Sequence, residues 1–323
     1  MSLDVSSRPE SRRVLVTGAS GFIGRRIVRS FLDRGWQVTA AVHKTPLPAW
    51  MAAVGVGQVG FTIDDLQPLT DAVRGAQAIC HAAAFMPADY GDSKHAAHCL
   101  QVNALFTLRL AELALEQPKL RFVHLSSAQG YDSSSNTACE EGDRLYPADR
   151  ATYYLTSKLA GELFVEHLRR TRGLCSVGLR VGSCYGSGMP SRSVVSIFLE
   201  RARSGQTIEV HDGGKATCDY VHVDDVARVA ALAAESGEPG MYNMGSGTAS
   251  SLVELARAAA GACPDMHVPI QVHPASENPA RGFAALSMQK TNSTWNHRPT
   301  KLRMGLAAMR RILDEEDCRN RAA

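Results

Sequence analysis

The sequence lacks several features that would define whole classes of protein. It has no uninterrupted apolar run long enough to cross a bilayer, so we expect no membrane span. The polar N-terminus, MSLDVSSRPESRR, contains no apolar core of a signal peptide. Its eight cysteines are scattered without a CxxC pair, which favours reduced thiols in a cytoplasm. A formal charge of only +3, spread along the chain, predicts no binding to nucleic acid or membrane surfaces.

What the sequence does contain is a regular alternation of strand and helix signals. The 323 residues, 45% of them hydrophobic, are enough for one large or two small domains. Helices are expected after the glycine loop as far as Gly35, and at 66–74, 94–117 and 151–171. Strands are expected between them at 13–17, 38–42, 58–63, 76–81, 121–125 and 176–181. This order predicts an α/β fold with a Rossmann-like, doubly wound parallel sheet and helices on both faces.

The pattern becomes less regular after residue 182, which suggests a division into domains. We expect a disordered tail at 1–12 and a dinucleotide-binding domain at 13–182. Residues 217–236, a strand end followed by a helix, are expected to return to that domain. The remainder of 183–323 is interpreted mainly as a smaller, C-terminal substrate-binding region.

A glycine-rich loop, Gly18-Ala19-Ser20-Gly21-Phe22-Ile23-Gly24, follows the first strand directly and opens a helix. Glycines at this point permit a tight turn and a close backbone approach to a pyrophosphate, and the helix N-terminus supplies N–H donors. A purely structural turn is the alternative. The strand–loop–helix context favours dinucleotide binding.

The residues after the second strand bear on the choice of dinucleotide. A carboxylate here would bind the ribose 2′-hydroxyl of NAD, but the sequence has His43 and Lys44. Basic groups suit a 2′-phosphate, so NADP(H) is favoured and NAD(H) is the alternative. In that alternative His43 and Lys44 are solvated loop residues.

The segment Tyr154-Leu155-Thr156-Ser157-Lys158 places a phenol and an ammonium four residues apart, on one face of the expected helix. A nearby ammonium lowers the pKa of a tyrosine, and such a phenol can exchange a proton during turnover. For an isolated pair, two surface residues are the better interpretation. The other motifs of the sequence decide between a catalytic pair and two surface residues.

Several motifs occur in an order that resembles the extended short-chain dehydrogenase/reductase family, the NAD(P)-dependent epimerase/dehydratase group. Together they run from Val14 to about Pro299. The similar segments are TGASGFIG at 17–24, Asp65-Leu66, HAAA at 81–84, Val102-Asn103, LSSAQGY at 125–131, YLTSKLAGE at 154–162, LRVGSCYG at 179–186 and YVHVDD at 220–225.

The resemblance implies roles for individual residues. Tyr154 would be the general acid/base, Lys158 would bind the nicotinamide ribose and lower the tyrosine pKa, and Ser127 rather than Ser126 would hydrogen-bond the reacting oxygen. Hydride transfer would be the chemistry. Cofactor contacts are implied at Gly18, Ser20, Gly21, Phe22, Ile23, Gly24, His43, Lys44, Asp65, Leu66, Ala82, Ala83, Asn103, Tyr154 and Lys158.

Two departures from the family pattern bear on the reaction. Dehydratases of the family carry an Asp-Glu pair after the catalytic serine, where this sequence has Ala128-Gln129. Members that act on sugar nucleotides usually carry a pyrophosphate-binding arginine where this sequence has Cys218. Dehydration is therefore disfavoured. Either another basic residue binds the substrate or the substrate is not a nucleotide sugar.

Substrate contacts are less defined than the catalytic residues. Met86 and Tyr90 follow the fourth strand, where ligands bind in doubly wound sheets. Arg192, Lys215 and Arg281 are candidates to replace the missing arginine. His95 and His98 share a helix face without a further ligand, so no metal site is predicted.

The preferred hypothesis is an NADPH-dependent ketoreductase acting on a small molecule, a nucleotide-linked keto sugar or a related polar carbonyl. An epimerase with retained NAD is the first alternative, and a non-catalytic dinucleotide-binding protein is the second. As the family often pairs two of its helices across a twofold axis, we expect a homodimer through helices 94–117 and 151–171.

Overall fold

The computed structural model describes residues 12–132, 137–146, 151–277 and 282–322, in two compact units that interleave along the chain. The first contains residues up to Ser126, Thr156–Gly178 and Ala227–Gly240. The second contains Ser127–Leu155, Leu179–Val226 and the residues from Met241 onward. Apart from Arg12, whose guanidinium pairs with Glu235, the expected tail at 1–12 lies outside the described residues.

A seven-stranded parallel sheet forms in the order β10-β6-β5-β4-β1-β2-β3. The strands are β1 (Arg13–Thr17), β2 (Gln37–Val42), β3 (Gly57–Gly60), β4 (Ala78–His81), β5 (Arg121–Ser127), β6 (Ser176–Val181) and β10 (Gly240–Met244). The chain order reverses between β1 and β4, which is where doubly wound folds bind ligands at the carboxyl ends of the strands. The predicted fold class is confirmed.

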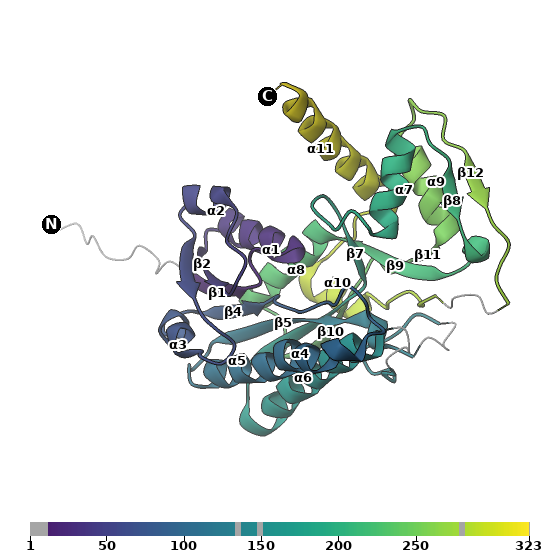
Figure 1. Ribbon diagram of the computed structural model, residues 1–323. Helices are drawn as coiled ribbons and strands as arrows, with labels where there is room; N and C mark the ends of the chain where they lie inside the picture. The colour runs from purple at the N-terminus through teal and green to yellow at the C-terminus, as the bar shows by residue number, and fades with distance from the viewer. Residues whose placement is uncertain (1–11, 133–136, 147–150, 278–281, 323) are drawn as a thin grey trace. The chain divides into compact units, whose positions relative to one another are not determined.

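Helices cover the sheet on both faces, as Figure 1 shows for α1 on one side and α3, α5 and α6 on the other. Short runs of helical residues alternate with the strands because apolar positions recur every three or four residues. The helices are α1 (Phe22–Asp33), α2 (Ala49–Ala53), α3 (Gln67–Val73), α5 (Phe106–Leu115), α6 (Thr152–Arg172) and α8 (Val223–Glu235).

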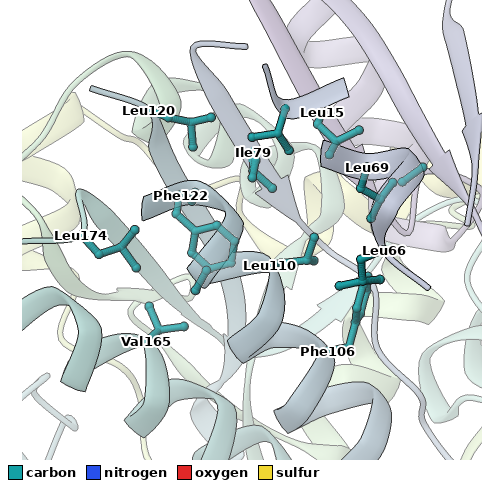
Figure 2. Packing of buried hydrophobic residues seen from close by; sticks show 14 of the residues in the cluster. Leu15, Leu66, Leu69, Ile79, Phe106, Leu110, Leu120, Phe122, Val165 and Leu174 are labelled. Carbon is teal, nitrogen blue, oxygen red and sulfur yellow. The ribbon is translucent and has the colours of Figure 1, made fainter. Parts of the chain in front are cut away.

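The core of the first unit lies between the sheet and α3, α5 and α6. Figure 2 shows Leu15, Ile79 and Phe122 from the strands facing Leu110 and Val165 from the helices. The rings of Phe61 and Phe106 stack with their centroids 5.2 Å apart at the edge of this cluster. Burial of these side chains holds the carboxyl ends of β1, β4 and β5 in register.

The helix expected at 94–117 is interrupted. It consists of a 3₁₀ turn (Ser93–His95), α4 (Ala96–Cys99), a π-helical turn (Leu100–Leu105) and α5. The interruption coincides with Asn103, whose buried amide donates to the Phe85 carbonyl (2.9 Å) and to Ser157 Oγ (2.9 Å), and accepts from the Phe85 N–H (2.7 Å). π turns of this kind recur at functional sites.

Close packing of α6 on this turn depends on Gly161. A Cβ at Gly161 would meet the Asn103 carbonyl oxygen far inside van der Waals contact. Thr107 Oγ1 donates to the same oxygen at 2.8 Å, so the carbonyl has little freedom to move away. The missing side chain therefore sets how near α6 comes to the π turn.

The second unit has its own sheets and core, where the sequence indicated only short, irregular elements. β7 (Ser183–Tyr185), β9 (Thr217–His222) and β11 (Ala249–Ser251) form one sheet, and β8 (Ile208–Val210) pairs with β12 (Ile270–Val272). Buried residues such as Tyr185, Phe198 and Leu255 form a core among α7 (Val194–Arg203), α9 (Leu252–Gly261) and α11 (Leu302–Ala322). The same unit also contains α10 (Gln289–Trp295).

All eight cysteines are free thiols, and five of them lie in or beside the cores. Within the described ranges, no helix combines the length and apolarity that crossing a bilayer requires. His95 and His98 pack their rings against Phe85, and the described part of the chain contains no cluster of three or more metal-binding side chains.

Gly161→Ala should lower the free energy of unfolding by about 2 kcal/mol, because the added methyl overlaps a fixed carbonyl and the overlap outweighs the helix-propensity gain of alanine. Urea denaturation of the two proteins measures the difference. Gly142→Ala, where a Cβ meets nothing within 4 Å, is the control and should change stability by less than about 0.5 kcal/mol. Equal stabilities for the two variants would contradict the packing argument.

Candidate active site

The glycine loop is built for contact between backbones. Gly18 has φ +70°, and a Cβ there would lie 2.6 Å from the Ala83 nitrogen at the end of β4. A Cβ on Gly24 would overlap the Gly18 carbonyl, and the Gly21 N–H donates to that carbonyl at 2.9 Å. The backbone of the loop therefore lies in direct contact with the residues that follow β4, a close approach that is typical of a pyrophosphate-binding turn.

The N-terminus of α1 has donors available to an anion. Gly21 is its N-cap and contributes no side-chain hydrogen bond, and the first turn contains no acidic residue. The positive end of the helix dipole and its unpaired N–H groups favour a bound phosphate. The residues Gly18, Ser20, Gly21, Phe22, Ile23 and Gly24 thus fit the pyrophosphate of a dinucleotide on the geometry of the loop itself.

His43 and Lys44 follow β2 and are both exposed. The His43 ring lies against Phe61, with centroids 5.6 Å apart. Burial, followed by the positive charges of Lys44 and His98, lowers the pKa of His43 below its ordinary value, although Asp64 opposes the shift. The basic side chain of Lys44 thus lies within electrostatic reach of His43 at this loop.

The other expected cofactor residues lie in the same unit. Asp65 Oδ1 accepts from the Gln67 N–H at 3.0 Å, and Leu66 is buried in the core, so Leu66 offers its backbone rather than its side chain. Ala82 and Ala83 border the glycine loop. The Asn103 amide is fully engaged inside the protein, which suits it to position α6 rather than to contact a ligand.

Lys158 is buried in the first unit with its ammonium donating to the Leu125 carbonyl at 2.5 Å. Burial lowers the pKa of Lys158 to about 8, and the negative charge of Glu162 opposes the shift only in part. Glu162 in turn accepts a hydrogen bond from Ser126 Oγ at 2.7 Å. The ammonium is thus held at the end of β5 and titrates close to physiological pH.

The two serines of the LSSAQGY segment differ in their surroundings. Ser126 is buried and its hydroxyl is committed to Glu162. Ser127 is half-buried, and its Oγ accepts a hydrogen bond from the Gln129 N–H at 3.3 Å, which leaves its own proton to donate. A hydrogen bond to a reacting oxygen therefore suits Ser127 better than Ser126.

Tyr154 and Lys158 both lie on α6, one turn apart, so their side chains point along the same face of that helix. Tyr153 and Tyr154 are equally half-buried, and only Tyr154 has the four-residue spacing to the lysine. The helical spacing that the sequence predicted is present.

The second unit contains a small cavity of about 20 Å³, whose lining begins with the residues that follow Ser127 in the sequence. Its volume accommodates roughly one water molecule, so it can admit a single polar group but not a sugar ring. The lining residues are Ala128, Gln129, Tyr131, Asp132, Cys139, Gly182, Ser183, Asp219, Phe283, Ala284 and Leu286.

Asp219 holds one wall of this cavity together. The carboxylate is buried and accepts hydrogen bonds from Ser246 Oγ and from the N–H groups of Ser246, Gly247 and Leu286, at 2.6–3.0 Å. Four donors satisfy the charge without a cation. Asp219 thus fixes the segment that carries Ala284 and Leu286, and its carboxylate oxygens are engaged in these hydrogen bonds.

The candidate substrate residues are dispersed. Arg192 and Lys215 are exposed in the second unit, and neither lines the cavity. Met86 is exposed and Tyr90 half-buried in the first unit. Arg281 lies outside the described residues. The substrate roles of these five residues stay predictions.

Sequence inspection missed Phe283 and Asp219 as cavity residues. Phe283 reaches the cavity because its N–H donates to the Thr217 carbonyl at 2.7 Å and Thr217 Oγ1 donates back to its carbonyl at 2.9 Å. No local signal joins residues 66 positions apart.

A family model described as NAD dependent epimerase/dehydratase family matches residues 14–245. The chain belongs to this family. The resemblance drawn from the motifs is confirmed, and with it membership of a family of NAD-dependent enzymes.

Two curated relatives and one solved structure illustrate the family. A dTDP-glucose 4,6-dehydratase of Streptomyces niveus is 31% identical over 264 residues, 78% of this chain and 77% of that protein. A dTDP-4-dehydro-6-deoxy-D-allose reductase of Streptomyces bikiniensis is 30% identical, over 78% of this chain and 81% of that protein. UDP-glucose 4-epimerase of Thermus thermophilus, solved with NAD, superposes with a TM-score of 0.76 at 28% identity, covering 92% and 97% of the two chains.

The titration of Lys158 predicts a pH dependence of dinucleotide binding. Because the protonated lysine is the stronger partner for ribose oxygens and the charged cofactor, the dissociation constant should rise above pH 8, by at most about tenfold per pH unit. Calorimetric titration with NADPH between about pH 6.5 and 9.5 measures it. Lys158→Met should bind more weakly with a flat profile; the wild-type profile in this variant would assign the titration to another group.

Proposed function

We propose that the protein is an NADPH-dependent ketoreductase that acts on a nucleotide-linked keto sugar or a related polar carbonyl. The observation that carries the proposal is the lining of the cavity next to Ser127. Its first two residues are Ala128 and Gln129, at the positions where dehydratases of the family hold their acid and base. Neither side chain can protonate a leaving hydroxyl or remove a proton next to a ketone.

The proposed roles follow from the surroundings of each side chain. Bound nicotinamide supplies the hydride. Ser127 donates a hydrogen bond to the carbonyl oxygen of the substrate. Tyr154 passes its phenolic proton to that oxygen as it becomes a hydroxyl. Lys158, on the same face of the helix, returns a proton to the Tyr154 phenolate. A neutral hydroxyl and a phenol suffice for this chemistry, because only one proton moves with each hydride.

Cofactor preference for NADPH over NADH rests on the end of β2. Lys44 is exposed there, and the stretch from Val42 to Thr45 contains no carboxylate. A 2′-phosphate could pair with this lysine, whereas a ribose 2′-hydroxyl would find no carboxylate acceptor in this stretch. NADPH also suits a net reductase, which must exchange its cofactor in every turnover.

Dehydration has support from relatives, since the Streptomyces niveus protein is named for that reaction. Two carboxylates do line the cavity here, Asp132 and Asp219. Asp219 is engaged by four hydrogen bonds, so among the described residues that line the cavity Asp132 is the one remaining carboxylate. Dehydration requires both a proton donor and a proton acceptor. We therefore place reduction ahead of dehydration.

An epimerase with retained NAD is the second candidate, favoured by the likeness to the Thermus thermophilus enzyme. The absence of a carboxylate in the stretch after β2 counts against it. For the substrate, the name of the Streptomyces bikiniensis reductase indicates that a relative acts on a dTDP-linked keto sugar, which supports a nucleotide-linked substrate here. Lys215, Arg192 or Arg281 would then bind the diphosphate, in place of the arginine that such family members usually carry where this chain has Cys218.

Three parallel assays separate the reactions. A dTDP-linked 4-keto-6-deoxyhexose with NADPH should be reduced, with one NADPH oxidised per alcohol formed. Conversion of dTDP-glucose to its 4-keto-6-deoxy product without net cofactor consumption would establish a dehydratase. Interconversion of UDP-glucose and UDP-galactose with a cofactor that survives gel filtration would establish an epimerase, and dinucleotide binding without turnover of any substrate would favour a non-catalytic protein.

Tyr154→Phe should reduce turnover by about a thousandfold or more while NADPH still binds, since the change removes only the transferable proton. Tyr153→Phe, the adjacent half-buried tyrosine without the lysine spacing, is the matched control and should retain nearly full activity. The ketone-reduction assay and a cofactor titration report both quantities. Unchanged turnover in Tyr154→Phe would overturn its assignment as acid.

We further propose a homodimer that pairs α4–α5 and α6 with their copies, in a reducing cytoplasm that suits eight free thiols. Large apolar side chains are exposed on these helices: Leu100 at 44%, Leu105 at 50% and Leu163 at 57%. Exposed large apolar side chains of this kind are typical of a surface that a second copy covers.

The double variant Leu105→Glu/Leu163→Glu should therefore be monomeric at concentrations where the wild type is dimeric, because a dimer would bury the added charges of both copies. Sedimentation equilibrium measures the mass of both. Ile197→Glu, at an exposed apolar position on α7 (41% exposed), is the control and should remain dimeric. A wild-type monomer, or an unaffected double variant, would refute this interface.

A further inference from the structure

The loops after β1 and β2 begin at the same edge of the sheet. The two strands are parallel neighbours, with Thr17 opposite Ala41, so the glycine loop leaves β1 beside the point where β2 ends. Lys44 follows Val42 by two residues. A cofactor with its pyrophosphate on the N-terminus of α1 therefore has its adenosine ribose between these two loops.

Arg25 lies over one of these loops. It stands in the first turn of α1, one residue after Gly24, and its Nε donates to the Ser20 carbonyl at 3.1 Å. This bond folds the side chain back toward the glycine loop instead of along the helix. Arg29, one turn further on, lies elsewhere, with its guanidinium over the Trp50 ring at 4.6 Å.

No acidic residue neutralises Arg25 within the described residues. Its hydrogen bond goes to a carbonyl, the first turn of α1 has no carboxylate, and the side chain is exposed. Most of its guanidinium N–H groups thus face solvent next to the helix N-terminus. Three positive contributions meet at this edge: the helix dipole, Arg25 and Lys44.

We propose that Arg25 is a second ligand of the cofactor's 2′-phosphate, acting together with Lys44 and selecting NADP(H) over NAD(H). The inference rests on the proposed use of NADPH. A guanidinium pre-oriented by Ser20 can hold two phosphate oxygens through its remaining N–H groups, while Lys44 acts as a point charge from the other loop. Residues of both loops then bind the 2′-phosphate, which is the one group by which NADP(H) and NAD(H) differ.

Calorimetric titration of the full-length, nucleotide-stripped protein with 2′,5′-ADP and with 5′-ADP isolates this contact, because the probes differ in the 2′-phosphate. Wild type should prefer 2′,5′-ADP. Arg25→Gln should weaken 2′,5′-ADP binding about tenfold or more and alter 5′-ADP binding less than about twofold. Arg29→Gln removes the same charge one turn away and should leave both affinities close to wild type.

The possible failures are distinguishable. Equal affinity of wild type for the two probes would overturn the proposed NADPH preference and the role of Arg25 with it. If the preference for 2′,5′-ADP survives in Arg25→Gln but not in Lys44→Gln, Arg25 is not a ligand of the 2′-phosphate, while the proposed NADPH preference stands. Equal weakening of both probes in Arg25→Gln would mean that Arg25 only orders the glycine loop, which also overturns the inference. Circular dichroism melting of each variant confirms that it is folded.

Discussion

Direct approach of one backbone to another is the constraint on which the first unit depends. At Gly161 the helix α6 meets the Asn103 carbonyl without an intervening Cβ, and at Gly18 the cofactor loop meets the end of β4 in the same way. Both contacts exist because glycine has no side chain, and any substitution would force backbone segments apart. The depth of α6 then decides where Lys158 lies, and its ammonium reaches the Leu125 carbonyl at the end of β5.

Asn103 connects this packing to the proposed chemistry. Its side chain holds the backbone of Phe85 on one side and the hydroxyl of Ser157, next to Lys158, on the other. The π turn adds a residue to the helix at this point, and the Asn103 side chain lies buried within the turn. A buried polar network with every group satisfied favours one arrangement over its competitors, so the same residue fixes both α6 and the loop after β4.

Charge is distributed in the candidate site according to what each part would bind. The edge formed by the glycine loop and the end of β2 is positive, through α1, Arg25 and Lys44. The lining of the cavity after Ser127 includes instead alanine, glutamine and two carboxylates, Asp132 and Asp219, and four hydrogen bonds stabilise the charge of Asp219. Under the proposed function, the basic edge of the first unit would bind the phosphorylated dinucleotide, and the lack of an acid–base pair in the cavity of the second unit would favour hydride transfer over elimination. Relatives named for dehydration and for reduction are 31% and 30% identical to this chain, so these local differences carry more information than overall similarity.

Local patterns in the chain were sufficient to predict the doubly wound sheet, the strand–loop–helix of Gly18–Gly24 and the spacing of Tyr154 and Lys158. These features depend on near neighbours: apolar periodicity, glycines in a turn and residues one helical turn apart. Long-range packing was needed to establish that the helix expected at 94–117 breaks at Asn103, that Ser126 is committed to Glu162 while Ser127 is not, and that Asp219 and Phe283 share one cavity. Each of these outcomes depends on a partner tens of residues away, and burial beside such a partner alters what a side chain can do without leaving a mark in the local sequence.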